Sequence, residues 1–148
     1  MTELVNSTFD WRCASTWKQS AINTSWCLVG CSIGDIGTIY YFQVNAIPWS
    51  TFSIMALAMF NGIITSIILE TIILIKQMKF LSALKTACGM SLISMISMEL
   101  AMNIVDYTVT GGAKVDLFVI PLMLIAGFLT PWPYNYWRLK KKGLGCCG

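Results

Sequence analysis

The chain has 148 residues, of which 56% are hydrophobic and only 11% charged, and its mean hydropathy is +0.68. A soluble globular domain has roughly one-quarter charged residues, so this composition excludes an ordinary soluble domain and predicts a polytopic membrane protein. The net charge is +3 and no histidine is present. The lack of histidine argues against histidine-based catalysis and against histidine-ligated zinc or haem.

Four apolar segments, separated by polar or turn-forming residues, follow one another along the chain. They comprise residues 20–44, 51–75, 81–108 and 117–137. Each is long enough to cross a hydrocarbon core about 30 Å thick. We therefore expect an all-α fold, an integral membrane four-helix bundle over residues 20–138. An N-terminal arm, residues 1–19, precedes it, and a basic, cysteine-containing tail, residues 139–148, follows it.

The basic residues are distributed unevenly between the two sides of such a bundle. The arm, the connection between the second and third segments, the tail and the helix ends next to them fall on one side and hold nine of the ten, whereas Lys114 falls on the other. The positive-inside rule then predicts that both termini are cytoplasmic in a plasma membrane, or on the matrix side of an organellar inner membrane. Topology explains these charges, and no nucleic-acid partner is expected.

The first segment carries two thiols and a carboxylate on one helical face. Cys27, Cys31 and Asp35 are spaced four residues apart, so their side chains point to the same side of a helix. This segment is the most polar of the four, and we expect the stripe to face protein rather than lipid. Thiol and thioether ligands select copper(I). Free cysteine is also a common buried hydrophobic residue, so both interpretations of the thiols stay open.

Depth in the membrane can be counted along each helix at a rise of about 1.5 Å per residue. By this count, acidic and sulfur-containing residues of the third and fourth segments fall near the depth of Asp35. Intramembrane acids are costly and by default functional; the alternative is a hydrogen-bonded pair that fixes helix register. Methionine is more often a packing residue than a ligand. The cluster expected in the outer half of the bundle, and the candidate metal site, consists of Cys27, Cys31, Asp35, Met95, Glu99 and Met123.

Four other polar residues are interpreted as structural. Glu70 lies near the cytoplasmic end of the second segment, where Lys85 of the third segment is the expected ion-pair partner. Asn103 and Asn135 are expected to form hydrogen bonds within the bundle, as polar residues do between packed membrane helices.

The cysteines outside the first segment have a different context. Most of the six cysteines fall in predicted spans or in the tail, so no disulfide framework is expected. Cys146 and Cys147 follow a basic run. They are candidates for acylation or for collection of a soft ion, and the third interpretation is a tail without a role.

Three stretches of the chain carry a resemblance to a known family: residues 27–35, 91–99 and 127–140. They resemble the small membrane proteins grouped as domain of unknown function 4396, whose pattern has His-Cys-x-x-Gly-Cys-x-x-Gly-Asp in the first span. Trp26 stands at the histidine position here, so any ligand role of that side chain is lost. The resemblance implies a four-helix membrane fold and no activity. The matching residues are Cys27, Cys31, Gly34, Asp35, Glu99, Pro133 and Asn135.

Two functions of different classes remain open, and an enzyme is not expected. The first is a small homo-oligomeric transporter or carrier for copper(I), with Cys27 and Cys31 as ligands and Asp35 and Glu99 as entry or relay acids. The second is a non-catalytic structural or assembly subunit of a larger, respiratory-type membrane complex. The direction of the Cys-Asp stripe separates them: it faces the interior or an oligomer axis in the first case and a partner chain in the second.

Overall fold

The computed structural model describes residues 11–76 and 78–141, without the side chains of residues 86, 90 and 91. It contains five helices: α1 (Ala14–Val44), α2 (Thr51–Ile75), α3 (Phe80–Thr110), α4 (Val119–Leu129) and α5 (Trp132–Lys141). The described residues include no β-strand, so the predicted all-α fold is confirmed. The tail cysteines Cys146 and Cys147 lie outside the described residues.

The helix boundaries agree with the hydropathy segments except near the two ends of the chain. α2 has the predicted limits, whereas α1 begins at Ala14, so part of the predicted arm is helical. The prediction of a single fourth helix is wrong, because α4 ends at Leu129 and α5 begins at Trp132. Pro131 and Pro133 have no amide hydrogen, so two of the helical hydrogen bonds at this point cannot form.

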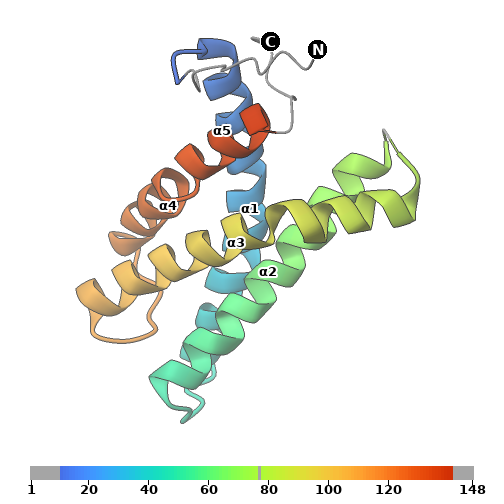
Figure 1. Ribbon diagram of the computed structural model, residues 1–148. Coiled ribbons are helices and arrows are strands. Elements are labelled where there is room, and N and C mark those ends of the chain that lie inside the picture. The colour runs from blue at the N-terminus through green and yellow to red at the C-terminus, as the bar shows by residue number, and fades with distance from the viewer. Residues whose placement is uncertain (1–10, 77, 142–148) are drawn as a thin grey trace, which may run out of the picture.

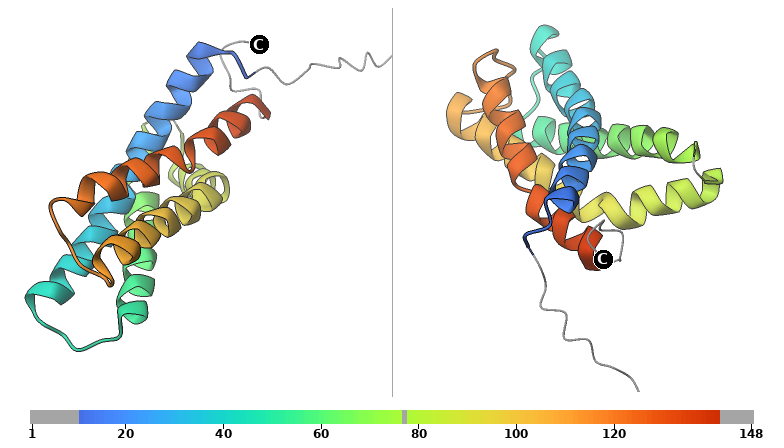
Figure 2. Two further views of the ribbon diagram at one scale, coloured as in Figure 1. Left: turned by 90° about the vertical axis from the view of Figure 1, so that its left-hand side faces the viewer. Right: turned by 90° about the horizontal axis from the view of Figure 1, so that it is seen from above.

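The helices cross one another rather than lying strictly parallel (Figures 1 and 2). α1 packs closely against α2, α3 crosses both, and α4 and α5 return toward the start of α1 (Figure 1). The turn between α2 and α3 stands away from the start of α1 and from α5 in Figure 1 and in the right-hand view of Figure 2. The central parts of α1, α2, α3 and α4 therefore enclose the core.

Small residues four positions apart allow α1 and α2 to approach closely. A Cβ atom added at Gly30 would lie 2.6 Å from the Ser66 Cα, and one added at Gly34 would overlap the backbone carbonyl of Asn61. The Thr65 hydroxyl donates to the Gly30 carbonyl at 2.6 Å. Small-residue spacing of this kind is typical of packed membrane helices. The crossing fixes which face of α1 is turned toward the core.

An aromatic cluster attaches α5 to the start of α1. The ring centroids of Trp17 and Tyr136 are 4.2 Å apart and stacked, and the Trp132 ring lies edge-on to Trp17 at 5.2 Å. The Cys13 amide donates to the Tyr136 hydroxyl at 3.3 Å. Cys13 is itself disulfide-bonded, whereas Cys27, Cys31 and Cys88 are free thiols.

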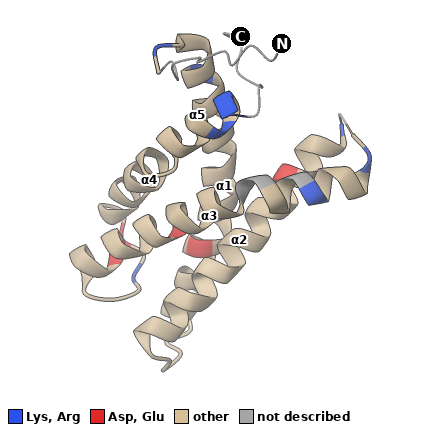
Figure 3. Cartoon of the chain, viewed as in Figure 1, with Lys and Arg blue, Asp and Glu red and all other residues tan. Residues whose placement is uncertain are grey.

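Charge and hydropathy are arranged as expected of a membrane protein. Figure 3 shows Lys and Arg at the start of α1, around the α2–α3 turn and on α5, whereas at the opposite end they occur in the connection between α3 and α4. Within residues 11–76 and 78–141, two helical stretches are long and apolar enough to cross a membrane: α2, and residues Leu92–Thr110 of α3.

Candidate functional site

The polar stripe of α1 faces the interior of the protein. Cys27 is 2% exposed, and Cys31 and Asp35 are completely buried. The same face continues toward the start of the helix through the buried Ser20 and Thr24. The prediction that this face of α1 is turned toward protein is therefore confirmed.

The thiols lie in a core that is rich in sulfur. We call this core the sulfur cluster, and it also includes Val119. Its sulfur-containing members are Cys27, Cys31, Met95, Met98, Met102 and Met123. Met95 and Met123 were predicted to lie beside the thiols, and the structure brings them there. Met98 and Met102 were expected to act as packing residues. Their spacing from Met95, three and seven residues, was a readable signal, because it places all three on one face of α3.

Two buried carboxyl groups lie beside the sulfur cluster. The Glu99 carboxyl is within electrostatic range of Asp35 and of the Cys31 thiol. The Asn103 amide donates to Asp35 Oδ1 at 3.1 Å and to the backbone carbonyl of Glu99 at 2.9 Å. Both carboxyl oxygens of Glu99 and Asp35 Oδ2 accept from no N–H or O–H donor among the described residues, although the Asp35 carboxyl and the Cys31 thiol lie close enough to Glu99 to share a proton with it. The acids are thus close together but largely unsatisfied.

Gly62 of α2 provides the space for the Glu99 carboxyl. A Cβ atom added at Gly62 would overlap Glu99 Oε1 and would lie 3.0 Å from the Cys31 carbonyl oxygen. α2 also contacts the thiols, because the Ser66 hydroxyl lies 3.2 Å from the Cys27 carbonyl oxygen and 3.4 Å from its sulfur. Three helices therefore position the thiols and the acids relative to one another.

A charged pair borders the sulfur cluster on the side of α5. The Arg138 guanidinium is within electrostatic range of Glu70 and of Cys27. Arg138 is partly buried, and Glu70 carries the opposite charge. Lys85, the partner expected for Glu70, is exposed. Sequence reasoning missed Arg138 as a neighbour of Glu70 because the two residues are far apart in the sequence and the basic side chain of Arg138 was expected at the membrane surface.

Asp106 lies on the opposite side of the acids. It is completely buried and accepts hydrogen bonds from the Thr110 hydroxyl and the Lys114 amide, each at 3.1 Å. It is also within electrostatic range of Asp35. Ionisable and sulfur-containing side chains therefore follow one another through the interior, from Arg138 to Asp106.

Two residues singled out in the sequence lie outside this series. Asn135 of α5 donates to the Thr24 hydroxyl at 2.8 Å and so joins α5 to α1. Trp26, at the position where the family has histidine, is 50% exposed. No group of three or more cysteine and acidic side chains among residues 11–76 and 78–141 is placed to hold a metal ion.

Comparison with known proteins yields one family. The pattern that defines the domain of unknown function (DUF4396) matches residues 16–143 and so includes nearly all of the described helices. No curated protein and no solved structure matches the chain. The comparisons therefore supply no activity, and the function has to be argued from the buried residues.

Proposed function

The chain belongs to the DUF4396 family, which is defined without an activity, and from its buried residues we propose that it is an integral membrane protein that carries or transports copper(I).

The distribution of apolar side chains supports a membrane location. Only 22% of the most apolar window of α2, and 39% of that of residues Leu92–Thr110, is buried within the protein. Most of these apolar side chains therefore face outward, where water would be unfavourable and lipid is the natural cover. α1 has 31 residues and is about 46 Å long, enough to cross as well. α4 and α5 together form the fourth, broken pass.

The orientation of these four passes follows from the basic residues, and the proposal places both termini on the cytoplasmic side. The disulfide at Cys13 points the other way, because disulfides are rare in reducing compartments. Labelling Lys18 in intact cells with a membrane-impermeant amine reagent decides between them. Protection until the membrane is permeabilised supports the cytoplasmic assignment, and labelling in intact cells overturns it.

The sulfur cluster is the observation that carries the copper hypothesis. Two buried free thiols and four buried thioethers belong to one core cluster drawn from α1, α3 and α4. Soft ligands of this kind favour copper(I) over hard divalent ions. Two thiolates with a neighbouring thioether would supply the ligands, with copper as the transported species rather than a resident cofactor.

The buried acids have a role in the same hypothesis. A cation inside a bilayer needs nearby negative charge, because the hydrocarbon does not solvate it. Glu99 and Asp35 lie beside Cys31 and would supply that charge on losing their protons to an incoming cation. We assign them as entry or relay acids, with Cys27 and Cys31 as the principal ligands.

The alternative, a structural subunit of a larger complex, expects the polar stripe of α1 to face a partner chain. In that case Cys31 and Asp35 should be exposed in the isolated protein. Both are completely buried, Cys31 within the sulfur cluster and Asp35 against Asn103 of α3. Their burial supports the carrier over the subunit.

The decisive experiment is a copper(I) titration of the detergent-purified protein. We expect stoichiometric binding that is lost in Cys27→Ser/Cys31→Ser and retained in Cys88→Ser, a matched control because Cys88 is also a free thiol but lies outside the cluster. The tail variant Cys146→Ser/Cys147→Ser should also bind. Absence of binding, or binding that survives the loss of Cys27 and Cys31, overturns the proposal. Co-purification of a partner subunit in its place would favour the alternative.

A further inference from the structure

The guanidinium of Arg138 lies beside the sulfur cluster with part of its hydrogen-bonding capacity unused. Its Nε and Nη1 atoms are buried and have no hydrogen-bond partner among the described residues. Glu70 and Cys27 are both within electrostatic range of it. A guanidinium carries five N–H donors in a fixed planar arrangement and stays charged in proteins. Arg138 is therefore a cation that a further anion next to Cys27 would stabilise.

The contact between α5 and α1 holds Arg138 in this position. Asn135 and Arg138 are three residues apart on α5 and so lie on one face of that helix. The Asn135 amide donates to the buried Thr24 hydroxyl of α1 at 2.8 Å. Cys27, which Arg138 approaches, follows Thr24 by three residues on the buried face of α1. The hydrogen bond thus sets the register in which the guanidinium meets the thiol-bearing face of α1.

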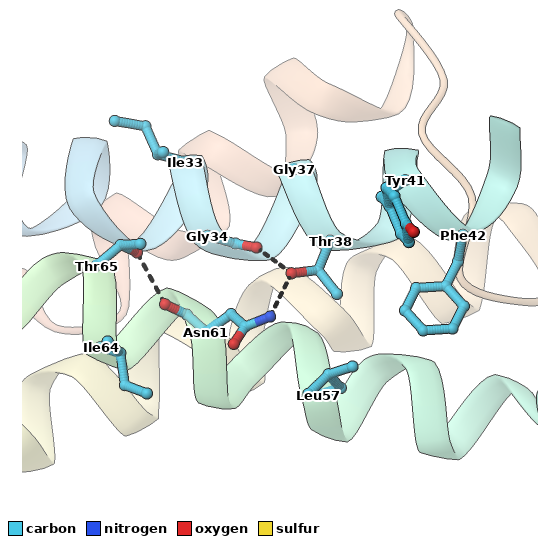
Figure 4. A pocket seen from close by; sticks show the side chains of 10 residues that line it. All are labelled: Ile33, Gly34, Gly37, Thr38, Tyr41, Phe42, Leu57, Asn61, Ile64 and Thr65. Atoms are coloured by element: carbon cyan, nitrogen blue, oxygen red, sulfur yellow. Dashed lines mark hydrogen bonds between the residues drawn. The ribbon is translucent and has the colours of Figure 1, made fainter. Parts of the chain in front are cut away.

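The described residues offer the thiols little other positive charge. The other basic residues among residues 11–76 and 78–141 are exposed, apart from Lys140, which is partly buried. The hollow between α1 and α2 is lined by uncharged residues, including Thr38, Asn61 and Thr65 (Figure 4). A negative charge formed at the thiols would therefore depend on Arg138 for its counter-charge.

Binding of copper(I) by two thiols changes the charge of the site. The Cys27 and Cys31 thiols lie close together within the sulfur cluster. Each copper(I) ion forms two Cu–S bonds as two S–H bonds break, the two protons pass to the solvent, and no oxidation state changes. The product is a bis-thiolate with one negative charge, and a thioether as a third ligand leaves that charge unaltered. A buried net charge is unfavourable unless an opposite charge lies nearby.

We propose that Arg138 is the counter-charge of the copper(I) bis-thiolate and makes the sulfur cluster selective for monovalent soft cations. The inference rests on the proposed function, since it assigns the selectivity of the same two ligands. A divalent soft cation such as cadmium(II) forms a bis-thiolate without net charge, so the guanidinium contributes little to its binding. Arg138 acts through the charge of the ligands and is not itself a ligand, because a guanidinium has no acceptor atom.

The test compares the affinities of the detergent-purified, full-length protein for copper(I) and cadmium(II) at one pH. Competition with a chromophoric chelator measures copper(I), and the thiolate charge-transfer absorption measures cadmium(II). Arg138→Gln should weaken copper(I) binding at least about tenfold and leave cadmium(II) binding nearly unchanged. Arg138→Lys keeps the positive charge and should recover most of the loss. Lys141→Gln, the matched control, removes an exposed cation of the same helix and should bind both metals as the wild type does.

Glu70→Gln separates charge balance from a structural role. Glu70 competes with the bis-thiolate for the same guanidinium, so its neutralisation should tighten copper(I) binding, whereas a purely structural pair predicts weaker binding in both Glu70→Gln and Arg138→Gln. Circular dichroism verifies that each variant keeps its helices.

The outcomes also separate this inference from the proposed function. Equal losses of both metals in Arg138→Gln, unchanged copper(I) binding in that variant, or weaker copper(I) binding in Glu70→Gln overturns the role of Arg138 and leaves the carrier in place. A wild-type protein that does not bind copper(I) overturns both.

Discussion

The approach of α1 to α2 can be tested by adding one methyl group. In Gly34→Ala the new Cβ would lie 2.5 Å from the carbonyl carbon of Asn61, where ordinary contact begins at 3.4 Å. The helices must therefore separate by about 1 Å, and the obstacle is backbone rather than a flexible side chain. This separation also weakens the bond from Thr65 to the Gly30 carbonyl, now 2.6 Å, and that from Asn61 to Thr38, now 2.9 Å.

The expected cost combines these effects. Overpacking costs about 1–3 kcal/mol, and each interhelical hydrogen bond contributes about 0.6 kcal/mol in a membrane protein. The better helix propensity of alanine returns about 0.5–1 kcal/mol. We therefore expect Gly34→Ala to lower the free energy of unfolding by about 2–3 kcal/mol.

Gly37→Ala is the matched control, three residues along the same helix, where an added Cβ meets nothing. Only the helix-propensity term applies there, so stability should rise by about 0.5–1 kcal/mol. Both are measured by reversible unfolding in mixed detergent micelles, followed by tryptophan fluorescence and by circular dichroism under monomeric conditions. Equal stability of the two variants would refute the close α1–α2 approach and, with it, the position of Cys31 in the core.

Three further predictions concern charged groups. Glu70→Gln should lower the free energy of unfolding by about 1–2 kcal/mol in thermal unfolding, because Arg138 loses a nearby negative charge. Lys85→Gln should leave it unchanged. A larger loss in Lys85→Gln than in Glu70→Gln would restore Lys85 as the partner of Glu70. Asp106→Ala should lower the free energy of unfolding by about 1–2 kcal/mol and speed amide hydrogen exchange in the α3–α4 connection, because the Lys114 amide loses its acceptor. Unchanged exchange would show that Asp106 does not hold this connection. Glu99→Met should raise stability by about 1–2 kcal/mol, since an apolar side chain replaces a buried carboxyl that accepts from no N–H or O–H donor among the described residues; a loss would indicate a register-fixing residue.

The depth of a side chain could be predicted from the sequence, because it follows from the rise per residue along a helix. Cys31, Asp35 and Glu99 were expected at neighbouring depths on faces turned inward, and the structure places them together. The limits of α2 were also predictable, since Pro48 precedes it and Ser50 caps its first turn by accepting from the Ser53 amide at 3.3 Å.

Rotation about the helix axes and contacts between distant segments could not be predicted in the same way. Lys85 and Arg138 both lie near the depth of Glu70, and only the packing of α5 decides which of them approaches it. Hydropathy also averages over Pro131 and Pro133, so a window that reports apolar content alone does not detect the break between α4 and α5. The prolines were visible, and their missing amides were the better guide to this boundary.

Glu99 is where the structural and functional hypotheses differ most. A residue that fixes helix register needs hydrogen bonds that only one arrangement satisfies, as Asn135 has with Thr24. Glu99 is completely buried and accepts from no N–H or O–H donor among the described residues, so that Asp35 and Cys31 are its close polar neighbours, while Asp35 receives an amide from Asn103. A buried carboxyl left in this state destabilises the fold, and packing alone gives no reason to retain it. A mobile cation bound next to the Cys31 thiol does give one, because it would supply the missing partner each time the site is filled.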